Sequence, residues 1–243
     1  MRYMITFSYD GSNFNGYQKQ DGCRTVEECL ENALYDINNH SETKIVSSGR
    51  TDKGVHAKAQ TAHFDLNVNI TEYKLKSAIN SLVPDDIHVI KAEKVNNDFH
   101  ARYNVKKKTY KYYLNIGEYN PMERKYVYQY NRELDIDKMK EAIKFFEGTH
   151  DFKNFVSSEC KKNSYIRDIY YADIEIKKNI IIFKFTGNGF MKYQVRNMVG
   201  TLLKVGKGKL EPNSIKEIID NPNRKKDVLT IKPEGLYLEE VKY

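Results

Sequence analysis

Residues 25–37 have the sequence TVEECLENALYDI, and their pattern predicts an amphipathic helix. Thr25 is a suitable N-cap residue, because Glu28 stands three residues later in the arrangement of a capping box. The apolar residues recur at helical spacing on one face, namely Val26, Cys29, Leu30, Ala33, Leu34 and Ile37. Such a helix must cover an apolar surface, and the flanking segments are typical of the strands of a sheet.

The elements around this helix define a known unit. In chain order we expect a strand over 2–9, the helix, strands near 44–48 and 58–66, a helix over 71–82 and a strand over 87–94. The second helix begins at Thr71 and ends before Pro84. This order is that of the split β-α-β unit of ferredoxin-like domains.

The second half of the chain repeats this order in part, without a repeat of sequence. It predicts a strand over 107–116, a helix over 135–147, a hairpin of 166–177 with 180–187, helices over about 190–205 and 213–220, and a strand over 236–242. We therefore predict an α+β fold with two ferredoxin-like halves, residues 1–103 and 104–243. Their antiparallel or mixed sheets would join into an extended central sheet, with an active-site cleft between the halves.

The composition excludes several classes of protein. Of 243 residues, 40% are hydrophobic and 30% charged, which favours a packed core over global disorder. No apolar run approaches the length of a membrane span, and the N-terminus lacks the apolar core of a signal peptide, so we expect a cytoplasmic protein. Cys23, Cys29 and Cys160 have neither metal-ligand nor redox spacing. His56 and His63 lack further ligands nearby in sequence, so we expect no metal and no cofactor.

Positive charge is concentrated in one stretch of a chain whose net charge is +7 and whose pI is about 9.0. The cations and His100 are interleaved with tyrosines: His100, Arg102, Tyr103, Lys106, Lys107, Lys108, Tyr110, Lys111, Tyr112, Tyr113, Arg124 and Lys125. Cations neutralise phosphates and aromatic rings stack on exposed bases. This mixture favours binding to RNA or single-stranded nucleic acid.

Two segments contain candidate site residues. In Gly49-Arg50-Thr51-Asp52-Lys53-Gly54, two glycines flank one carboxylate after an expected strand, which indicates a tight loop that presents Asp52. The alternative is a solvated turn in which Asp52 bonds its own backbone. Further along, Arg196 lies at the border of the apolar face of the last long helix. There it either reaches a buried carboxylate or is a solvated arginine on the helix flank.

Five motifs in order resemble the tRNA pseudouridine synthase A family over nearly the whole chain. They lie at residues 9–20, 49–57, 99–112, 195–200 and 234–238. Three positions depart from the family pattern. Tyr17 replaces a usual tryptophan, Lys53 an often small residue and Gln194 a frequent methionine. None of these departures removes a residue that the resemblance implies to be catalytic.

The resemblance implies isomerisation of uridine to pseudouridine, with Asp52 as the nucleophile. Arg196 would be its counter-charge, Tyr110 would stack on the target uracil, and Arg50 would fill the space left by the displaced base. It also implies tRNA as the partner, adjacent uridines on the 3′ side of the anticodon stem-loop as targets, and a homodimer. By residues alone, Tyr110 could equally be a core tyrosine. A paralogue with another RNA target and a non-catalytic RNA-binding protein are the alternatives.

Overall fold

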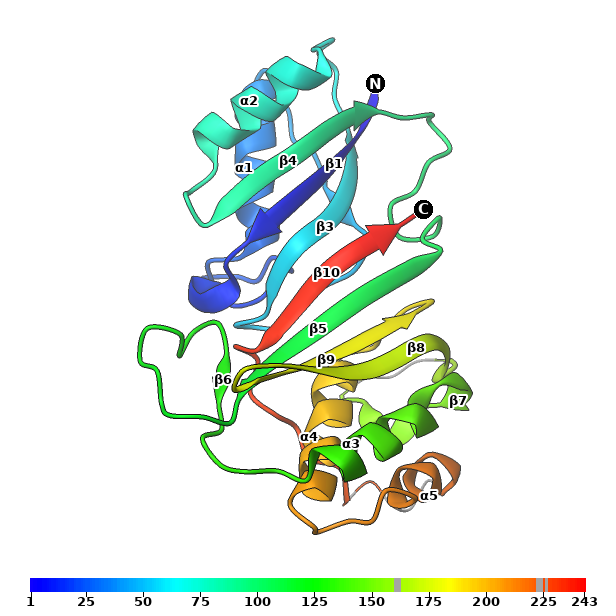
Figure 1. Cartoon of the computed structure of the whole chain (residues 1–243). Helices are drawn as coiled ribbons and strands as arrows, with labels where there is room; N and C mark the ends of the chain where they lie inside the picture. The colour runs from blue at the N-terminus through cyan, green and yellow to red at the C-terminus, as the bar shows by residue number, and fades with distance from the viewer. Residues whose placement is uncertain (160–162, 222–224, 226) are drawn as a thin grey trace. The chain divides into compact units, whose positions relative to one another are not determined.

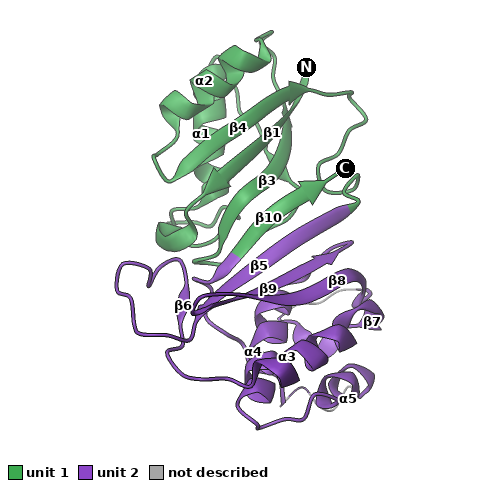
Figure 2. Cartoon of the chain, in the orientation of Figure 1, with its two compact units in different colours: residues 1–106, 237–243 green, residues 107–236 purple. Residues whose placement is uncertain are grey.

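The computed structural model describes residues 1–159, 163–221, 225 and 227–243. They form two compact units: unit 1 contains residues 1–106 and 237–243, and unit 2 contains residues 107–236 (Figure 2). The sequence placed the division at 103/104, whereas the chain passes between the units at 106/107. The last seven residues return to unit 1, because the final strand pairs with a strand of that unit.

The sheet of unit 1 has the strand order of a split β-α-β unit (Figure 1). β1 (Arg2–Tyr9) pairs antiparallel with β3 (His56–Asp65) on one side and with β4 (Ile87–Lys94) on the other. β2 (Val46–Ser47) pairs antiparallel with β3. β1 and β4 have the expected bounds, β2 is shorter than expected, and β3 begins two residues earlier than the predicted 58.

Two helices supply the apolar cover of this sheet. α1 (Val26–Ile37) begins where its sequence predicts, and the Thr25 side chain accepts the Glu28 N–H at 3.4 Å. α2 (Glu72–Leu82) is capped in the same way by Thr71. Every second residue of β1 is buried, which matches the two-residue period of a strand with one covered face. The core therefore lies between the helices and this face.

β10 (Leu236–Lys242) is the expected final strand, and it pairs parallel with β3. Tyr237 lies opposite His56 and Leu238 opposite Ala57. A parallel neighbour requires a long crossover, here everything between β3 and residue 236. Local sequence patterns do not predict such a distant pairing.

The sheet of unit 2 is built on a long hairpin. β8 (Ile166–Lys177) and β9 (Ile180–Gly187) have the expected bounds and turn at residues 178–179. β5 (Lys107–Asn115) pairs with β9 and β7 (Gly148–Asp151) with β8, both antiparallel. β6 (Tyr128–Gln129) pairs parallel with β5. The short strands β6 and β7 were not predicted, because two to four residues leave no readable period.

The helices of unit 2 differ from their predicted lengths. α3 (Ile136–Ile143) ends earlier than residue 147, because a 3-10 turn follows at Lys144–Phe146. α4 (Gln194–Gly206) begins at residue 194 and not near 190, because Tyr193 has a left-handed φ of +66°. α5 (Ser214–Asp220) agrees with the sequence. α4 is the central helix of the unit, since eleven of its thirteen residues are buried.

Candidate functional site

The loop between β2 and β3 contains Arg50 and Asp52, and side chains from the sheet hold its backbone. Gln60 on β3 donates from Nε2 to the Gly49 carbonyl oxygen at 2.9 Å and accepts from the Ser48 hydroxyl at 2.6 Å. The buried hydroxyls of Thr51 and Tyr9 share a hydrogen bond of 2.8 Å. The residue before Asp52 is thus fixed to β1, and the loop start is fixed to β3.

The opening segment of the chain packs directly against this loop. The Tyr17 N–H donates to the Thr51 carbonyl oxygen at 3.1 Å. Gly16 has φ +101°, and a Cβ there would lie 3.1 Å from the same oxygen. A Cβ on Gly11 would overlap the Val55 carbonyl group. Both glycines of the motif at 9–20 therefore allow a backbone approach that a side chain would block.

His56 joins these two segments from the first position of β3. It is 2% exposed, and its Nδ1 lies 3.1 Å from both the Gly11 nitrogen and the Asp10 Oδ1. Its ring stacks on Tyr237 of β10 with centroids 4.6 Å apart. His56 thus ties the opening segment and the last strand to the end of the loop.

Asp52 lies at the bend of the loop. The Val55 N–H donates to the Asp52 carbonyl oxygen at 3.1 Å, and Gly54 has φ +78°, so the main chain turns back immediately after Asp52. Asp52 is half-buried, whereas Arg50 and Lys53 are exposed. The backbone of Asp52 is therefore fixed, and its side chain is partly shielded from solvent.

Arg50 contributes to the charge balance at the start of α1. Burial raises the pKa of Glu27, and the backbone N–H of Lys19 and the nearby positive charge of Arg50 oppose that rise. Glu27 accepts the Lys19 N–H at 2.7 Å. Arg50 is therefore near the helix that covers the sheet, while its own side chain stays exposed.

Tyr110 lies on β5 in unit 2 and is 8% exposed. Phe190 packs edge-on against its ring, with centroids 5.2 Å apart and planes at 76°. Phe190 belongs to the segment that leads into α4. Tyr110 is thus a largely buried ring held by an aromatic neighbour, a setting that suits a wall of a pocket as well as a core position.

Arg196 is anchored in unit 2 and is not a solvated flank residue. Its Nε donates to the Ile231 carbonyl oxygen at 2.8 Å, and its guanidinium lies 4.8 Å from the centre of the Tyr193 ring. Burial raises the pKa of Glu234, while the charges of Lys232 and Arg196 oppose this. Glu234, which opens the motif at 234–238, is thus a carboxylate near Arg196 that the sequence reasoning did not assign to it.

The contacts of Gln194 account for its departure from the family pattern. It is fully buried, its Oε1 accepts the Met191 N–H at 3.0 Å, and its own N–H donates to the Met191 carbonyl oxygen at 3.0 Å. A methionine sulfur would be a much weaker acceptor for the first of these hydrogen bonds. Gln194 therefore fixes the turn that delivers Arg196 and Phe190.

Comparison with known proteins agrees with this arrangement of motifs. The family profile described as tRNA pseudouridine synthase matches residues 5–104 and 142–243. A protein named tRNA pseudouridine synthase A from Streptococcus agalactiae serotype Ia is 46% identical over all of this chain and 95% of its own length. The chain belongs to the tRNA pseudouridine synthase family.

Other members of this family also match over the whole chain. The tRNA pseudouridine synthase A of Oceanobacillus iheyensis is 44% identical, and tRNA pseudouridine synthase A 1 of Bacillus cereus (strain ATCC 14579) is 43% identical. Both alignments cover all of this chain, and they cover 96% and 98% of the two relatives. Arg50, Asp52 and Arg196 lie inside the ranges matched by the family profile, and Tyr110 lies between them.

Within this family member, the four candidate residues divide between the units. Arg50 and Asp52 share one loop of unit 1, while Tyr110 and Arg196 belong to unit 2. The pairing of Asp52 with Arg196 and the cleft between the halves stay predictions. Among the described residues, no group of three or more His, Cys, Asp or Glu is arranged to hold a metal ion. Cys23 and Cys29 are free thiols, and Cys160 lies outside the described residues.

Across the ranges that the structure describes, no helix has both the length and the apolar character that a membrane crossing requires.

Proposed function

We propose that this protein converts uridine to pseudouridine in tRNA, with Asp52 as the catalytic residue. The observation that carries the proposal is Asp52 itself, half-buried on a loop whose backbone is held by Tyr9, Tyr17 and Gln60. The full-length similarity to proteins named tRNA pseudouridine synthase A supports both the reaction and the substrate class.

The reaction explains why one carboxylate is enough. The bond from C1′ to N1 breaks, the uracil turns, C5 bonds to C1′, and the C5 proton is lost while N1 gains one. Glycoside hydrolysis uses two carboxylates, because a leaving group must be protonated and water must attack. Here uracil leaves as a delocalised anion and returns, so no second acid is required. Asp52 acts either by attack at C1′ or by deprotonation to a glycal.

Asp52 must stay ionised in a site from which RNA excludes water. A positive charge nearby favours the ionised form of a carboxylate against desolvation. We assign this role to Arg196, which its contacts with Ile231 and Tyr193 hold in one orientation. Tyr110 would stack on the target uracil, and Arg50 would occupy the space that the displaced base leaves.

The finer substrate assignment follows the family resemblance. We propose adjacent uridines on the 3′ side of the anticodon stem-loop as the targets, and a homodimer in the cytoplasm as the active form. One pocket that serves several neighbouring positions must recognise shape and phosphates more than base identity. Sedimentation of the purified protein with and without tRNA tests the homodimer.

Replacement of Asp52 tests the catalytic assignment. We expect Asp52→Asn and Asp52→Ala to lower pseudouridine formation in a tRNA transcript by at least about 10³-fold, as loss of a nucleophile does. Binding of the same transcript should persist. Asp85→Asn is the matched control, because Asp85 is an exposed carboxylate of the same unit outside the loop. Retained turnover in the Asp52 variants would refute the assignment.

The same assay separates the alternatives. A non-catalytic RNA-binding protein would bind the transcript and form no pseudouridine even as the wild type. A paralogue with another target would leave the anticodon stem-loop unmodified but modify other positions. Mapping pseudouridines in total RNA from cells with and without the protein distinguishes these two outcomes.

A further inference from the structure

Residues 100–104 of unit 1 form a turn that holds one tyrosine far into solvent. Tyr103 is 77% exposed, yet its ring is not free of support. It stacks on the His100 ring, with centroids 4.2 Å apart and planes at 28°. The His100 ring in turn lies 4.8 Å from that of the buried His63 on β3. Three rings thus lead outward from the core to Tyr103.

Hydrogen bonds within the turn fix the direction of this ring. The Nδ1 of His100 accepts the backbone N–H of Arg102 at 3.1 Å and of Tyr103 at 3.3 Å. The Asn104 N–H donates to the His100 carbonyl oxygen at 3.0 Å, and the Asn104 side-chain oxygen accepts the His100 N–H. An exposed side chain on such a turn loses little further freedom when a ligand binds.

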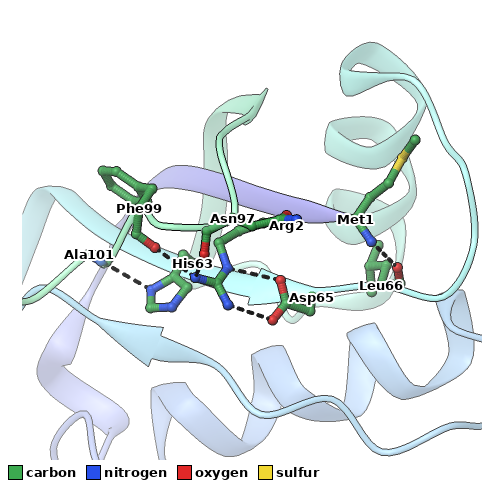
Figure 3. Close-up of polar contacts among 8 residues, drawn as sticks. All are labelled: Met1, Arg2, His63, Asp65, Leu66, Asn97, Phe99 and Ala101. Atoms are coloured by element: carbon green, nitrogen blue, oxygen red, sulfur yellow. Dashed lines mark hydrogen bonds and ion pairs between the residues drawn. The ribbon is translucent and has the colours of Figure 1, made fainter.

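The turn is also attached to the sheet (Figure 3). The Ala101 N–H donates to His63 Nδ1 at 3.1 Å, and the Ala101 carbonyl oxygen accepts the Tyr243 hydroxyl at 2.8 Å. Figure 3 shows the Arg2 guanidinium between Asp65 and the segment that leads into the turn. It forms a two-fold hydrogen bond with Asp65 and donates to the Phe99 carbonyl oxygen at 3.0 Å.

The turn lies at the far end of β3 from the catalytic loop. His56 at the start of β3 contacts the segment beside Asp52, whereas the turn is tied to His63, seven residues later in the same strand. At about 3.3 Å per residue, this separation is roughly 20 Å. A nucleotide that contacts Tyr103 is therefore a different one from the uridine that reacts at Asp52.

The chemistry of the turn suits a nucleobase. Flat aromatic rings stack on bases of any sequence, and cations beside them bind the flanking phosphates. Arg102 and Lys106 are exposed within three residues of Tyr103 in the chain, and Asp98 is the exposed acid near the start of the turn. We propose that Tyr103 is a stacking surface for an unpaired base of the RNA, outside the catalytic pocket. This inference rests on the proposed RNA-modifying function.

Three variants test the stacking surface by their affinity for a tRNA transcript. We expect Tyr103→Ala to weaken binding about 10-fold, which is the usual effect of removing a ring that stacks on a base. Tyr103→Phe keeps the ring and should bind as the wild type does. Tyr73→Ala is the matched control, because Tyr73 is 80% exposed on α2 of the same unit and should leave affinity unchanged. Tyr103→Ala should raise KM, while turnover at saturating tRNA should equal that of the wild type.

Salt dependence separates stacking from phosphate contacts. Tyr103→Ala should weaken binding by the same factor at every salt concentration, because no charge is lost. Arg102→Ala and Lys106→Ala should each make the dependence of log affinity on log salt shallower, by about one unit per lost phosphate contact. A changed slope in Tyr103→Ala would contradict the assignment of stacking.

Other outcomes would overturn the inference in recognisable ways. If Tyr103→Ala binds the transcript as tightly as the wild type does, Tyr103 is not a stacking surface. If Tyr103→Phe loses as much affinity as Tyr103→Ala, the hydroxyl and not the ring makes the contact. A smaller sedimenting mass of free Tyr103→Ala would show a contact between copies of the chain instead. If the wild type forms no pseudouridine in tRNA, the proposed function fails whatever Tyr103 does. If the wild type is active and Tyr103→Ala matches it in affinity and KM, only the present inference fails.

Discussion

The loop at residues 48–55 and the segment at 187–196 both present a charged candidate residue, but they are held by different means. In unit 1, hydrogen bonds from Tyr9, Tyr17 and Gln60 fix the loop around Asp52. In unit 2, Arg196 extends from a helix with eleven of thirteen residues buried. Hydrogen bonds fix the first site, whereas the second depends mainly on burial of a whole helix, with one hydrogen bond from Arg196 itself. The two sites should therefore respond differently to substitutions and to pH.

The largest effect is expected where packing holds the site. A methyl group on Gly200 of α4 would overlap the Leu229 carbonyl oxygen, next to the Ile231 carbonyl that anchors Arg196. We expect Gly200→Ala to lower the free energy of unfolding by about 3 kcal/mol, since buried overlap forces the backbone to shift. Urea unfolding monitored by circular dichroism measures this loss. An unchanged midpoint would show that α4 moves freely against residues 229–231.

A smaller loss of stability is expected from the equivalent change in unit 1. A Cβ on Gly11 would meet the Val55 carbonyl, but Gly11 lies in a short 3-10 turn that can shift more easily than α4. We expect Gly11→Ala to cost about 2 kcal/mol. Its kcat should fall more than its stability suggests, because the displaced partner is the loop of Asp52. Equal kcat values for Gly11→Ala and wild type would contradict the role of this contact.

Two buried threonines, one in each unit, allow a sharper comparison. Thr51 bonds Tyr9 beneath the Asp52 loop, and Thr109 bonds Thr186 at 2.9 Å between β5 and β9. Both hydroxyl pairs are buried, so Thr51→Val and Thr109→Val should each cost about 1 kcal/mol of unfolding free energy. Only Thr51→Val should also lower kcat, because its bond orients a catalytic loop. Equal kcat losses in the two variants would remove the distinction between the sites.

The local patterns in the sequence predicted most elements and could not predict their distant partners. Thr25 and Thr71 mark helix starts through their own neighbours, and the alternation in residues 2–9 defines β1. By contrast, the predicted start of α4 was wrong, because Tyr193 adopts a left-handed φ that favours glycine. A helical period does not reveal this.

The same limit holds for the candidate site: its local features could be predicted from the sequence, and its distant contacts could not. Asp52 and Arg50 lie on one short loop, so their proximity to each other follows from the sequence. The anchor of Arg196 is a carbonyl 35 residues away, and that of Thr51 is a hydroxyl 42 residues away. Gln194 appeared as a departure from the family, and its role required the Met191 contact to be seen. Distances along the chain of this size leave no local signal.

The smallest expected effect is a change of stability with pH. It concerns His63, which forms polar contacts in unit 1. Burial, followed by the charges of Arg2 and His100, lowers the pKa of His63, while Asp65 opposes the shift. The folded state therefore binds a proton less readily than the unfolded state, whose histidine pKa is about 6.5. The stability linked to His63 is present above that pH and is lost as pH falls through the lower folded value.

Protonation of His63 would also remove the acceptor of the Ala101 N–H, so acid should loosen the 100–104 turn of unit 1. We expect the urea midpoint of the wild type to fall between pH 7.5 and 5.5 by more than that of His63→Asn, which cannot titrate there. Parallel falls in both proteins would assign the acid sensitivity to other groups. Arg196 is held in unit 2 by a carbonyl and a buried helix. Because His63 belongs to unit 1 and lies outside the loop of Asp52, His63→Asn should leave kcat at saturating tRNA unaltered at pH 7.5.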